Sequence, residues 1–247
     1  MKETTTNPII EIKGLCKSFD DNDVLKGIDL IINKGENVVV LGKSGSGKSV
    51  LIKCIVGLID ADEGTIQVFD NDMRALSHKE LNEVRLKTGF LFQNAALYDS
   101  MTVRENLDFH LSRGLNDLSV DERNEQIEKA LDDVGLLEAI DKMPSELSGG
   151  MRKRVGLARS LILKPEIMLY DEPTTGLDTV TSREISELIL AMQKKYKTTS
   201  VIITHDMPCA KLTSDRVVVF KDGVIIAEGS YDELEHSKDK WVKSFFN

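Results

Sequence analysis

An unbroken run of glycine, serine and lysine constrains the fold of this chain more than any other feature of its sequence. The run spans residues 42–49 and matches the pattern GxxxxGK[ST] at every fixed position. It follows the apolar run Val38–Leu41 and precedes residues 49–57, whose apolar positions have helical spacing. A strand, a glycine-rich loop and a helix in this order predict backbone N–H groups that surround phosphate oxygens at the helix N-terminus. We therefore expect an α/β protein that holds a nucleoside triphosphate.

Each part of this phosphate loop has an expected task. Glycines let the backbone curl around the phosphates, Lys48 can reach the β- and γ-phosphates, and the Ser49 hydroxyl can ligate Mg²⁺. The predicted nucleotide contacts are Gly42, Lys43, Ser44, Gly45, Ser46, Gly47, Lys48, Ser49 and Val50. The alternative is a Gly- and Ser-rich turn that contains lysine by chance, and the flanking strand and helix disfavour it.

Two acidic residues at the end of a second apolar run supply chemistry that a phosphate loop alone lacks. Ile167–Tyr170 leads directly to Asp171 and Glu172, which Pro173 follows. Asp171 can hold Mg²⁺ through water, and Glu172 would lie nearer the γ-phosphate, where a carboxylate can orient or polarise the attacking water. A strand that ends in two solvated acids is the alternative. Together with the phosphate loop, the acidic pair predicts hydrolysis of ATP.

Charge and apolar segments exclude several kinds of partner. Lys and Arg total 32 against 41 Asp and Glu, so the formal net charge is −9. This balance disfavours nucleic acid as a partner, and it disfavours docking on anionic lipid by charge alone. The longest apolar runs, such as Val38–Leu41, are far shorter than the roughly 20 residues of a membrane-spanning helix. Residues 1–4 are polar, which predicts no secretory signal, and the three separated cysteines are typical of reduced thiols in a cytosol.

The remaining pattern predicts a helical segment within an α/β core. Residues 9–13 alternate as expected of a strand with one wet face, and residues 217–221 have strand character. Residues 81–164 contain mostly helical spacing, including a capping box from Ser119 to Glu122 that opens an amphipathic helix. No repeat or low-complexity linker divides the 247 residues, which fit one large domain.

A second candidate anion site lies where two glycines precede a helix, in the segment Leu147–Met151. Ser148, Gly149 and Gly150 are predicted nucleotide contacts, because the N–H groups and the hydroxyl there would face outward. The following helix of about 13 residues spans roughly 20 Å before the strand that leads to Asp171. We therefore do not expect the segment to reach the phosphate loop of its own chain, which favours a dimer with each ATP between two copies. An ordinary Gly-Gly helix start is the alternative.

With these motifs in this order, the sequence resembles the ATP-binding subunits of ABC transporters over nearly its whole length. The resemblance implies four further site residues: Phe19 as the ring that stacks on adenine, Gln93 as a contact of Mg²⁺ or water, Asp178 in the loop after the acidic pair, and His205 as a γ-phosphate contact. By the same resemblance the catalytic residues are Glu172, His205, Lys48 and Gln93, and the metal-binding residues are Ser49, Gln93 and Asp171.

The resemblance also implies the architecture. We expect a P-loop NTPase (RecA-like) core with an antiparallel β subdomain and an inserted α-helical subdomain. Residues 9–247 would form a single ATPase domain, with 9–92 and 165–247 as the nucleotide-binding core and 93–164 as the mainly helical subdomain that contains the Leu147–Met151 signature.

Partners and location follow from the resemblance as well. A homodimer with ATP at its interfaces would power an integral-membrane permease that docks near Asn94–Met101, on the cytoplasmic side of the bacterial inner membrane. The loop, the signature and the tail Trp241–Phe246 are similar to those of the Mla-type ATPases, which energise phospholipid transport together with an MCE-domain protein. Two departures from common patterns are Met151 in place of Gln and Thr179 in place of Pro.

Three other hypotheses for the function compete with phospholipid transport. The first is the ATPase of another ABC transporter, for amino acids, metals or lipoprotein release. The second is a soluble ABC protein that acts on DNA or the ribosome, which would need paired ATPase domains, long insertions or basic arms. The third is a P-loop kinase of small molecules, which would leave the Leu147–Met151 segment and His205 without a purpose.

Overall fold

Two β-sheets and their flanking helices build residues 7–114 and 118–246, the part of the chain that the computed structural model describes. The strands are β1 (Pro8–Phe19), β2 (Asn22–Asn33), β3 (Asn37–Gly42), β4 (Glu63–Val68), β5 (Asn71–Asp72), β6 (Thr88–Leu91), β7 (Ile167–Asp171), β8 (Thr199–Thr204), β9 (Arg216–Lys221) and β10 (Val224–Gly229). The α-helices are α1 (Lys48–Ile55), α2 (His78–Leu86), α3 (Val103–Gly114), α4 (Val120–Asp133), α5 (Gly149–Leu161), α6 (Thr179–Tyr196), α7 (Met207–Thr213), α8 (Tyr231–Glu235) and α9 (Lys240–Lys243).

The larger sheet has six strands in the order β10-β9-β3-β8-β7-β6. Its last five strands in this order run parallel to one another, and β10 pairs antiparallel with β9 at one edge. Parallel strands end at a common edge of their sheet, where ligands of such folds bind. The segments that follow β3, β6, β7 and β8 therefore meet at one edge, and these segments hold the phosphate loop, Gln93, Glu172 and His205.

Side chains of this sheet alternate between two hydrophobic cores. In β3, Val38 and Val40 join the core on one face, together with α1 and the smaller sheet. Val39 and Leu41 join the core on the other face, together with helices α3 to α7. Both faces are thus covered, which explains why the central strands are unbroken apolar runs, as expected of parallel sheets.

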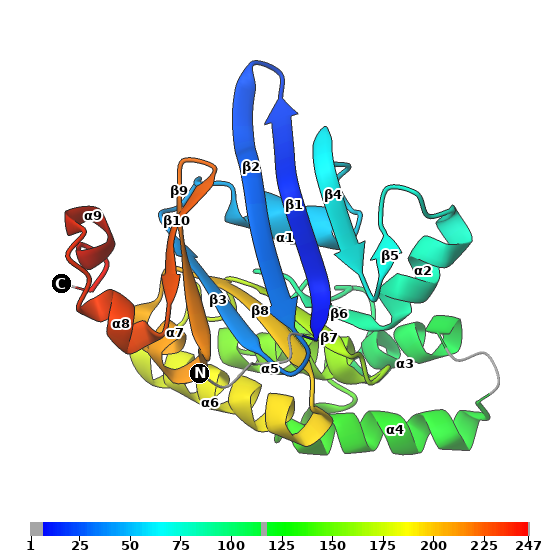
Figure 1. The fold of residues 1–247 in the computed structure, drawn as a ribbon. Helices are drawn as coiled ribbons and strands as arrows, with labels where there is room; N and C mark the ends of the chain where they lie inside the picture. Colours follow the sequence, from blue (N-terminus) through cyan, green and yellow to red (C-terminus); the bar gives the residue numbers. More distant parts are fainter. Residues whose placement is uncertain (1–6, 115–117, 247) are drawn as a thin grey trace.

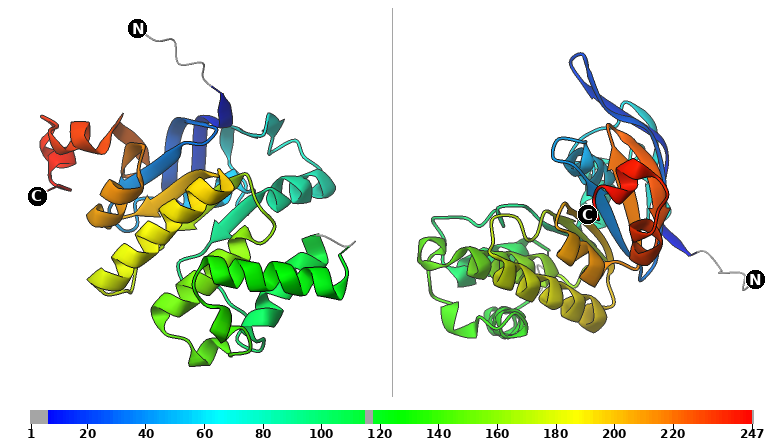
Figure 2. Two further views of the ribbon diagram at one scale, coloured as in Figure 1. Left: turned by 90° about the horizontal axis from the view of Figure 1, so that it is seen from below. Right: turned by 90° about the vertical axis from the view of Figure 1, so that its left-hand side faces the viewer.

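The smaller sheet and a helical segment complete the fold. The four antiparallel strands of the smaller sheet have the order β2-β1-β4-β5, and the β1–β2 hairpin rises above the larger sheet in Figure 1. The views in Figure 2 place α3, α4 and α5 in a lobe to one side of the two sheets. The Ser119–Glu122 capping box is present at the start of α4, as predicted. This arrangement confirms the fold class predicted from the sequence.

No helix in residues 7–114 and 118–246 has the length and apolar character required to cross a lipid bilayer.

Replacing Ile202 by Ala should show how much the central strand β8 contributes to stability. Ile202 is fully buried in the core between the larger sheet and helices α3 to α7. Removing its side-chain carbons loses burial and leaves a cavity, so we expect the free energy of unfolding to fall by about 2–5 kcal/mol. Ile226→Ala on the edge strand β10 is the control, because that side chain is 38% exposed, and it should cost less than about 1 kcal/mol. Urea denaturation measures both, and equal losses would contradict the prediction.

Candidate active site

The phosphate loop has a backbone that only glycine accommodates at its tightest points. Gly47 has φ 102°, and a Cβ on it would lie 2.8 Å from the Val24 carbonyl oxygen. A Cβ on Gly42 would lie 2.6 Å from the Phe220 carbonyl oxygen, nearer than real Cβ atoms approach. Inside this curled backbone, Ser46 Oγ is buried and has no hydrogen-bond partner among the described residues. Such an unpaired buried hydroxyl fits a loop that has a ligand as its missing partner.

Lys48 folds back over this loop. Its Nζ donates to the carbonyl oxygens of Gly42, at 2.7 Å, and Lys43, at 3.0 Å. Only 5% of Lys48 is exposed, and burial lowers the pKa of its ammonium, although the carboxylates of Glu172 and Asp171 oppose this shift. A buried cation is therefore held at the mouth of the loop, where it can bind phosphate oxygens.

Two of the predicted metal-binding residues meet at the start of α1. Ser49 Oγ donates to Asp171 Oδ1 at 2.7 Å, although the two residues are 122 positions apart in the sequence. In the described part of the chain, no group of three or more His, Cys, Asp and Glu side chains is arranged to hold a metal. A hydroxyl and one carboxylate nevertheless fit Mg²⁺, which commonly takes one or two protein oxygens and completes its shell with water and substrate phosphates.

Glu172 lies at the centre of the site. Its Oε2 lies 2.8 Å from His205 Nδ1 and accepts a hydrogen bond from Thr175 Oγ1 at 3.1 Å, while Oε1 is 3.9 Å from Lys48 Nζ. Its backbone has φ 50°, a left-handed conformation that is unusual for a residue with a Cβ. The carboxylate is thus oriented by three side chains from three loops, which suits a group that must hold one water in line.

Gln93 follows β6, the strand next to β7. Leu91 pairs with Tyr170 in the parallel register, so Gln93 lies two positions beyond that pair, level with Glu172. Gln93 is exposed and its side chain has no hydrogen bond among the described residues. The structure therefore places Gln93 at the sheet edge that also holds the phosphate loop, and no hydrogen bond among the described residues joins it to Ser49 or Asp171.

An arginine that the sequence analysis did not single out holds the loop after Gln93. Ala95 and Ala96 both have positive φ, 58° and 48°. Arg159 of α5 is 6% exposed and donates to both of their carbonyl oxygens, at 2.8 Å each. An arginine on the otherwise apolar face of α5 is the sequence signal that could have identified this contact, because a buried guanidinium needs partners.

The signature segment packs against the start of α6. Ser148 caps α5, with its Oγ accepting from the Met151 N–H at 3.2 Å. A Cβ on Gly150 would lie 2.6 Å from Thr181 Cγ2, so any larger residue there would displace the Thr181 side chain. Asp178 caps α6 by accepting from the N–H groups of Val180 and Thr181. Among the described residues, no hydrogen bond joins the signature segment to the phosphate loop of the same chain.

Phe19 ends strand β1, where the β1–β2 hairpin passes the phosphate loop. Val24, on the neighbouring strand β2, has its carbonyl oxygen 2.8 Å from the position that a Cβ on Gly47 would occupy. The ring of Phe19 is 43% exposed, and Lys17 Nζ lies 5.3 Å from its centroid. An exposed ring beside the loop is available to stack on a base.

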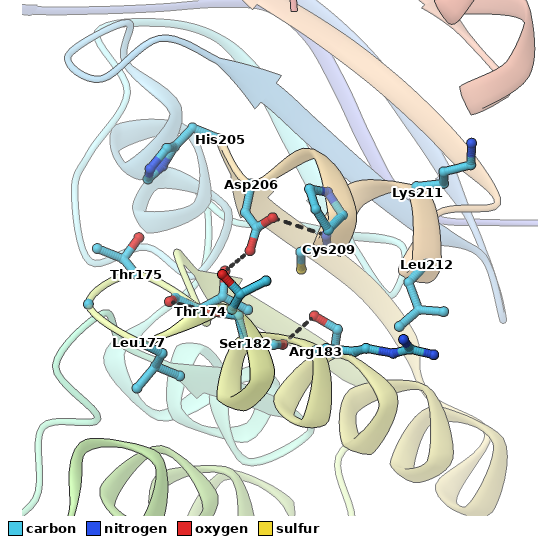
Figure 3. Close-up of a pocket in the computed structure, with 14 residues that line it drawn as sticks. Thr174, Thr175, Leu177, Ser182, Arg183, His205, Asp206, Cys209, Lys211 and Leu212 are labelled. Atoms are coloured by element: carbon cyan, nitrogen blue, oxygen red, sulfur yellow. Dashed lines mark hydrogen bonds between the residues drawn. The ribbon is translucent and has the colours of Figure 1, made fainter. Parts of the chain in front are cut away.

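Two cavities adjoin these residues. The first, of about 710 Å³, lies between α6 and α7 beside His205, and no phosphate-loop residue lines it. Figure 3 shows Asp206 within this cavity, bonded to Thr174 and to the start of α7 at Cys209. The second, of about 580 Å³, is a groove whose lining includes Leu58, Phe90, Phe92, Phe109 and Arg159. The groove lining contains the three arginines Arg85, Arg113 and Arg159, and it contains no Asp or Glu.

His110, in the wall of this groove, should make stability depend on pH. Burial, with the nearby charges of Arg159 and Arg113, lowers the pKa of His110 from 6.5 to about 4. The unfolded chain takes up a proton as pH falls through its ordinary value while the folded chain does not, so stability is lost as pH falls from 6.5 toward 4. Between pH 7 and pH 5 we expect this residue to account for a loss of about 1 kcal/mol, discounted for its partial exposure. Urea denaturation of the native chain and His110→Gln at both pH values tests this, and identical losses would contradict it.

These features define a P-loop ATPase: a phosphate-binding loop, a buried lysine and a carboxylate positioned beside them on the edge of a parallel sheet. The model of the family described as "ABC transporter" matches residues 25–175. The chain belongs to the ABC transporter family and is an ATP-binding subunit that hydrolyses ATP.

The names of similar proteins refer to different substances. The chain is 39% identical to the "Probable ribonucleotide transport ATP-binding protein mkl" of Mycobacterium leprae, over 96% of this chain and 68% of that protein. It is 37% identical to the "L-cystine import ATP-binding protein TcyN" of Bacillus subtilis, over 96% and 92%. It is 36% identical to "Protein TRIGALACTOSYLDIACYLGLYCEROL 3, chloroplastic" of Arabidopsis thaliana, over 98% and 74%.

A solved structure supports the ATPase assignment. The ATP-binding cassette MJ0796, determined as a dimer in a post-hydrolysis state with ADP and Pi, superposes with a TM-score of 0.83 at 31% identity. The match covers 90% of this chain and 98% of the cassette.

Proposed function

We propose that two copies of this chain bind two ATP molecules between them and power a membrane permease that transports phospholipid. The observation that supports hydrolysis most directly is the contact of Glu172 with His205, beside Lys48 and the Ser49–Asp171 pair. In this proposal Glu172 orients the attacking water, and His205 holds the γ-phosphate. When bound at Ser49 and Asp171, with Gln93 nearby, Mg²⁺ would neutralise charge on the β- and γ-phosphates.

The position of the signature segment supports the proposed pairing of two copies. Ser148 is exposed at the N-terminus of α5, and in the described residues nothing bonds it to the phosphate loop of its own chain. An exposed helix N-terminus favours the binding of an anion. A second copy would therefore present its ATP to Ser148, Gly149 and Gly150, with Asp178 close to the same nucleotide. The dimeric state of MJ0796 supports this proposal. Addition of ATP to Glu172→Gln should convert monomer to dimer in size-exclusion chromatography, and a persistent monomer would count against it.

The groove beside Asn94–Met101 is the proposed docking site of the permease. Tyr98 of that segment lies against Phe109, which also lines the groove, with ring centroids 5.0 Å apart. Apolar walls and three arginines in a chain of net charge −9 suit a short apolar helix with an acidic residue. The chain would then work as a peripheral subunit on the cytoplasmic side of a bacterial inner membrane.

Phospholipid as cargo rests on the similarity of the loop, the signature and the tail Trp241–Phe246 to the Mla-type ATPases. The name of the Arabidopsis relative contains that of a galactolipid, which supports a lipid as cargo without indicating phospholipid. An MCE-domain protein would be the further partner. The second candidate is the ATPase of an importer for a small molecule such as an amino acid, which the Bacillus relative favours.

Purification of the tagged chain from solubilised membranes separates these candidates. Recovery of a multi-span permease together with an MCE-domain protein and bound phospholipid supports the proposal. Recovery of a permease with a small-molecule-binding protein favours the importer, and recovery of ribosomes or DNA would exclude transport. Leu58→Glu, at a groove residue that is 51% exposed, should reduce permease recovery and keep ATP hydrolysis. Ile31→Glu on β2, 44% exposed, is the matched control and should reduce neither.

A further inference from the structure

A second buried lysine reaches the main chain of Glu172 from the signature helix. Lys153 of α5 is 5% exposed, and its Nζ donates to the Glu172 carbonyl oxygen at 3.1 Å. This is its one hydrogen bond among the described residues. Lys153 lies outside the phosphate loop and the signature motif, so the mechanism described above gives it no task.

Burial of an ammonium is costly unless partners compensate for the lost water. The pKa of Lys153 is lowered to about 8 by burial, while the charges of Glu172 and Asp171 favour its protonated form. A neutral side chain of similar length would fill the same space without this cost. The presence of a cation there is therefore better explained by the group it contacts than by packing.

The main chain of Glu172, which Lys153 contacts, is strained. Glu172 has φ 50°, and a left-handed conformation costs a residue with a Cβ on the order of 1–3 kcal/mol. Three hydrogen bonds hold the main chain of Glu172, one at its N–H and two at its carbonyl, which also accepts from the Thr175 N–H at 3.3 Å. The Glu172 N–H donates to the Ile203 carbonyl of β8 at 2.9 Å, and Lys153 binds the Glu172 carbonyl. The direction of the carboxylate depends on this backbone, because the side chain leaves from the same Cα.

The helix that supplies Lys153 also includes residues that contact two other parts of the site. Ser148 caps its first turn, five residues before Lys153, or about 7.5 Å along the axis. Six residues after Lys153, Arg159 donates to the carbonyls of the loop that follows Gln93. A shift of α5 would thus act on Glu172 and on that loop together.

We propose that Lys153 is a positioning residue, which links the signature helix α5 to the backbone of Glu172 and so orients the carboxylate for hydrolysis. This inference rests on the proposed role of Glu172. In the proposed dimer, α5 begins at the nucleotide held by the partner, so the contact connects occupancy of one ATP site to the geometry of the other within a single chain.

Steady-state phosphate release and ATP binding test this link in the full chain. Lys153→Met keeps the length of the side chain and removes the donor, so we expect kcat to fall about 10- to 100-fold while KM and the Kd of ATP change less than about twofold. Lys153→Arg, which restores a cationic donor, should recover part of the rate. Lys129→Met, at an exposed lysine of α4, is the matched control and should leave the rate unchanged.

A double-variant cycle distinguishes positioning from a structural role. If Lys153 acts through the carboxylate, adding Lys153→Met to Glu172→Gln should lower the residual rate by less than about twofold. Native turnover in Lys153→Met, or an equal loss in both backgrounds, would overturn the inference and leave the role of Glu172 intact. Native turnover in Glu172→Gln would instead remove Glu172 from catalysis, which contradicts the proposed function itself. Thermal unfolding of each variant identifies any loss caused by misfolding, and Lys153→Arg then decides the question.

Discussion

Replacing Glu172 by Gln is expected to lower the rate of ATP hydrolysis by about 10²- to 10⁴-fold, the contribution typical of a general base. The amide keeps the size of the side chain and can still contact His205 and Thr175, which lie 2.8 and 3.1 Å from Oε2. It cannot polarise a water as a carboxylate does. ATP binding should persist, because the phosphate loop and Lys48 are unchanged. Phosphate release measured beside equilibrium binding of ATP checks both parts.

The control for this variant is a second glutamate, which lies outside the proposed active site. Glu187 of α6 is 53% exposed and pairs with Arg183 on the same helix, so Glu187→Gln should hydrolyse ATP at the native rate. A surface pair of this kind contributes less than about 1 kcal/mol to stability. If Glu172→Gln kept native turnover, His205 or a phosphate oxygen would have to accept the proton, and the geometry around Glu172 would need another explanation.

Replacing Lys48 by Met should act at the earlier step of binding. The loss removes a cation from the mouth of the loop, and hydrogen bonds to charged groups contribute about 1.5–3 kcal/mol each. Two such bonds to phosphate oxygens correspond to a rise in the Kd of ATP of about 10²- to 10⁴-fold. Equilibrium binding of a fluorescent ATP analogue measures this rise. Lys53→Met, one turn along the same helix α1, is the matched control and should change the Kd little.

The Lys48 variant should also show how the loop is held without nucleotide. Lys48 donates to the carbonyls of Gly42 and Lys43 and lies close to Glu172. Its removal takes one donor from each of those carbonyls, although the Lys43 carbonyl still accepts from the Ser46 N–H at 3.3 Å. It also leaves Glu172 with less positive charge beside it, while it relieves the cost of a buried ammonium. The two effects oppose each other, so we expect the melting temperature to change far less than the affinity for ATP. A large loss of stability with unchanged affinity would contradict the assigned task of Lys48.

Much of the fold was predictable because it depends on local patterns. The run Val38–Leu41 indicated a strand covered on both faces, and the structure places its side chains alternately in two cores. A Cβ would be blocked at Gly42 and Gly47, and Gly45 has a positive φ of 79°. The Ser119 capping box needs only hydrogen bonds within one turn of helix. Such features are encoded by neighbours in the sequence, so the sequence is sufficient to identify them.

The contacts that build the site could not be read from the sequence. Ser49 and Asp171 are 122 residues apart, Glu172 and His205 are 33 apart, and Lys153 meets a main-chain carbonyl that no side-chain pattern marks. The parallel register of β3, β8 and β7 decides which strand ends lie side by side, and this register depends on how both cores pack. By itself, the sequence determined that a phosphate loop, an acidic pair and a signature helix exist. Only the tertiary structure decided that they converge on Glu172, because convergence requires strands distant in sequence to end at one edge of a sheet.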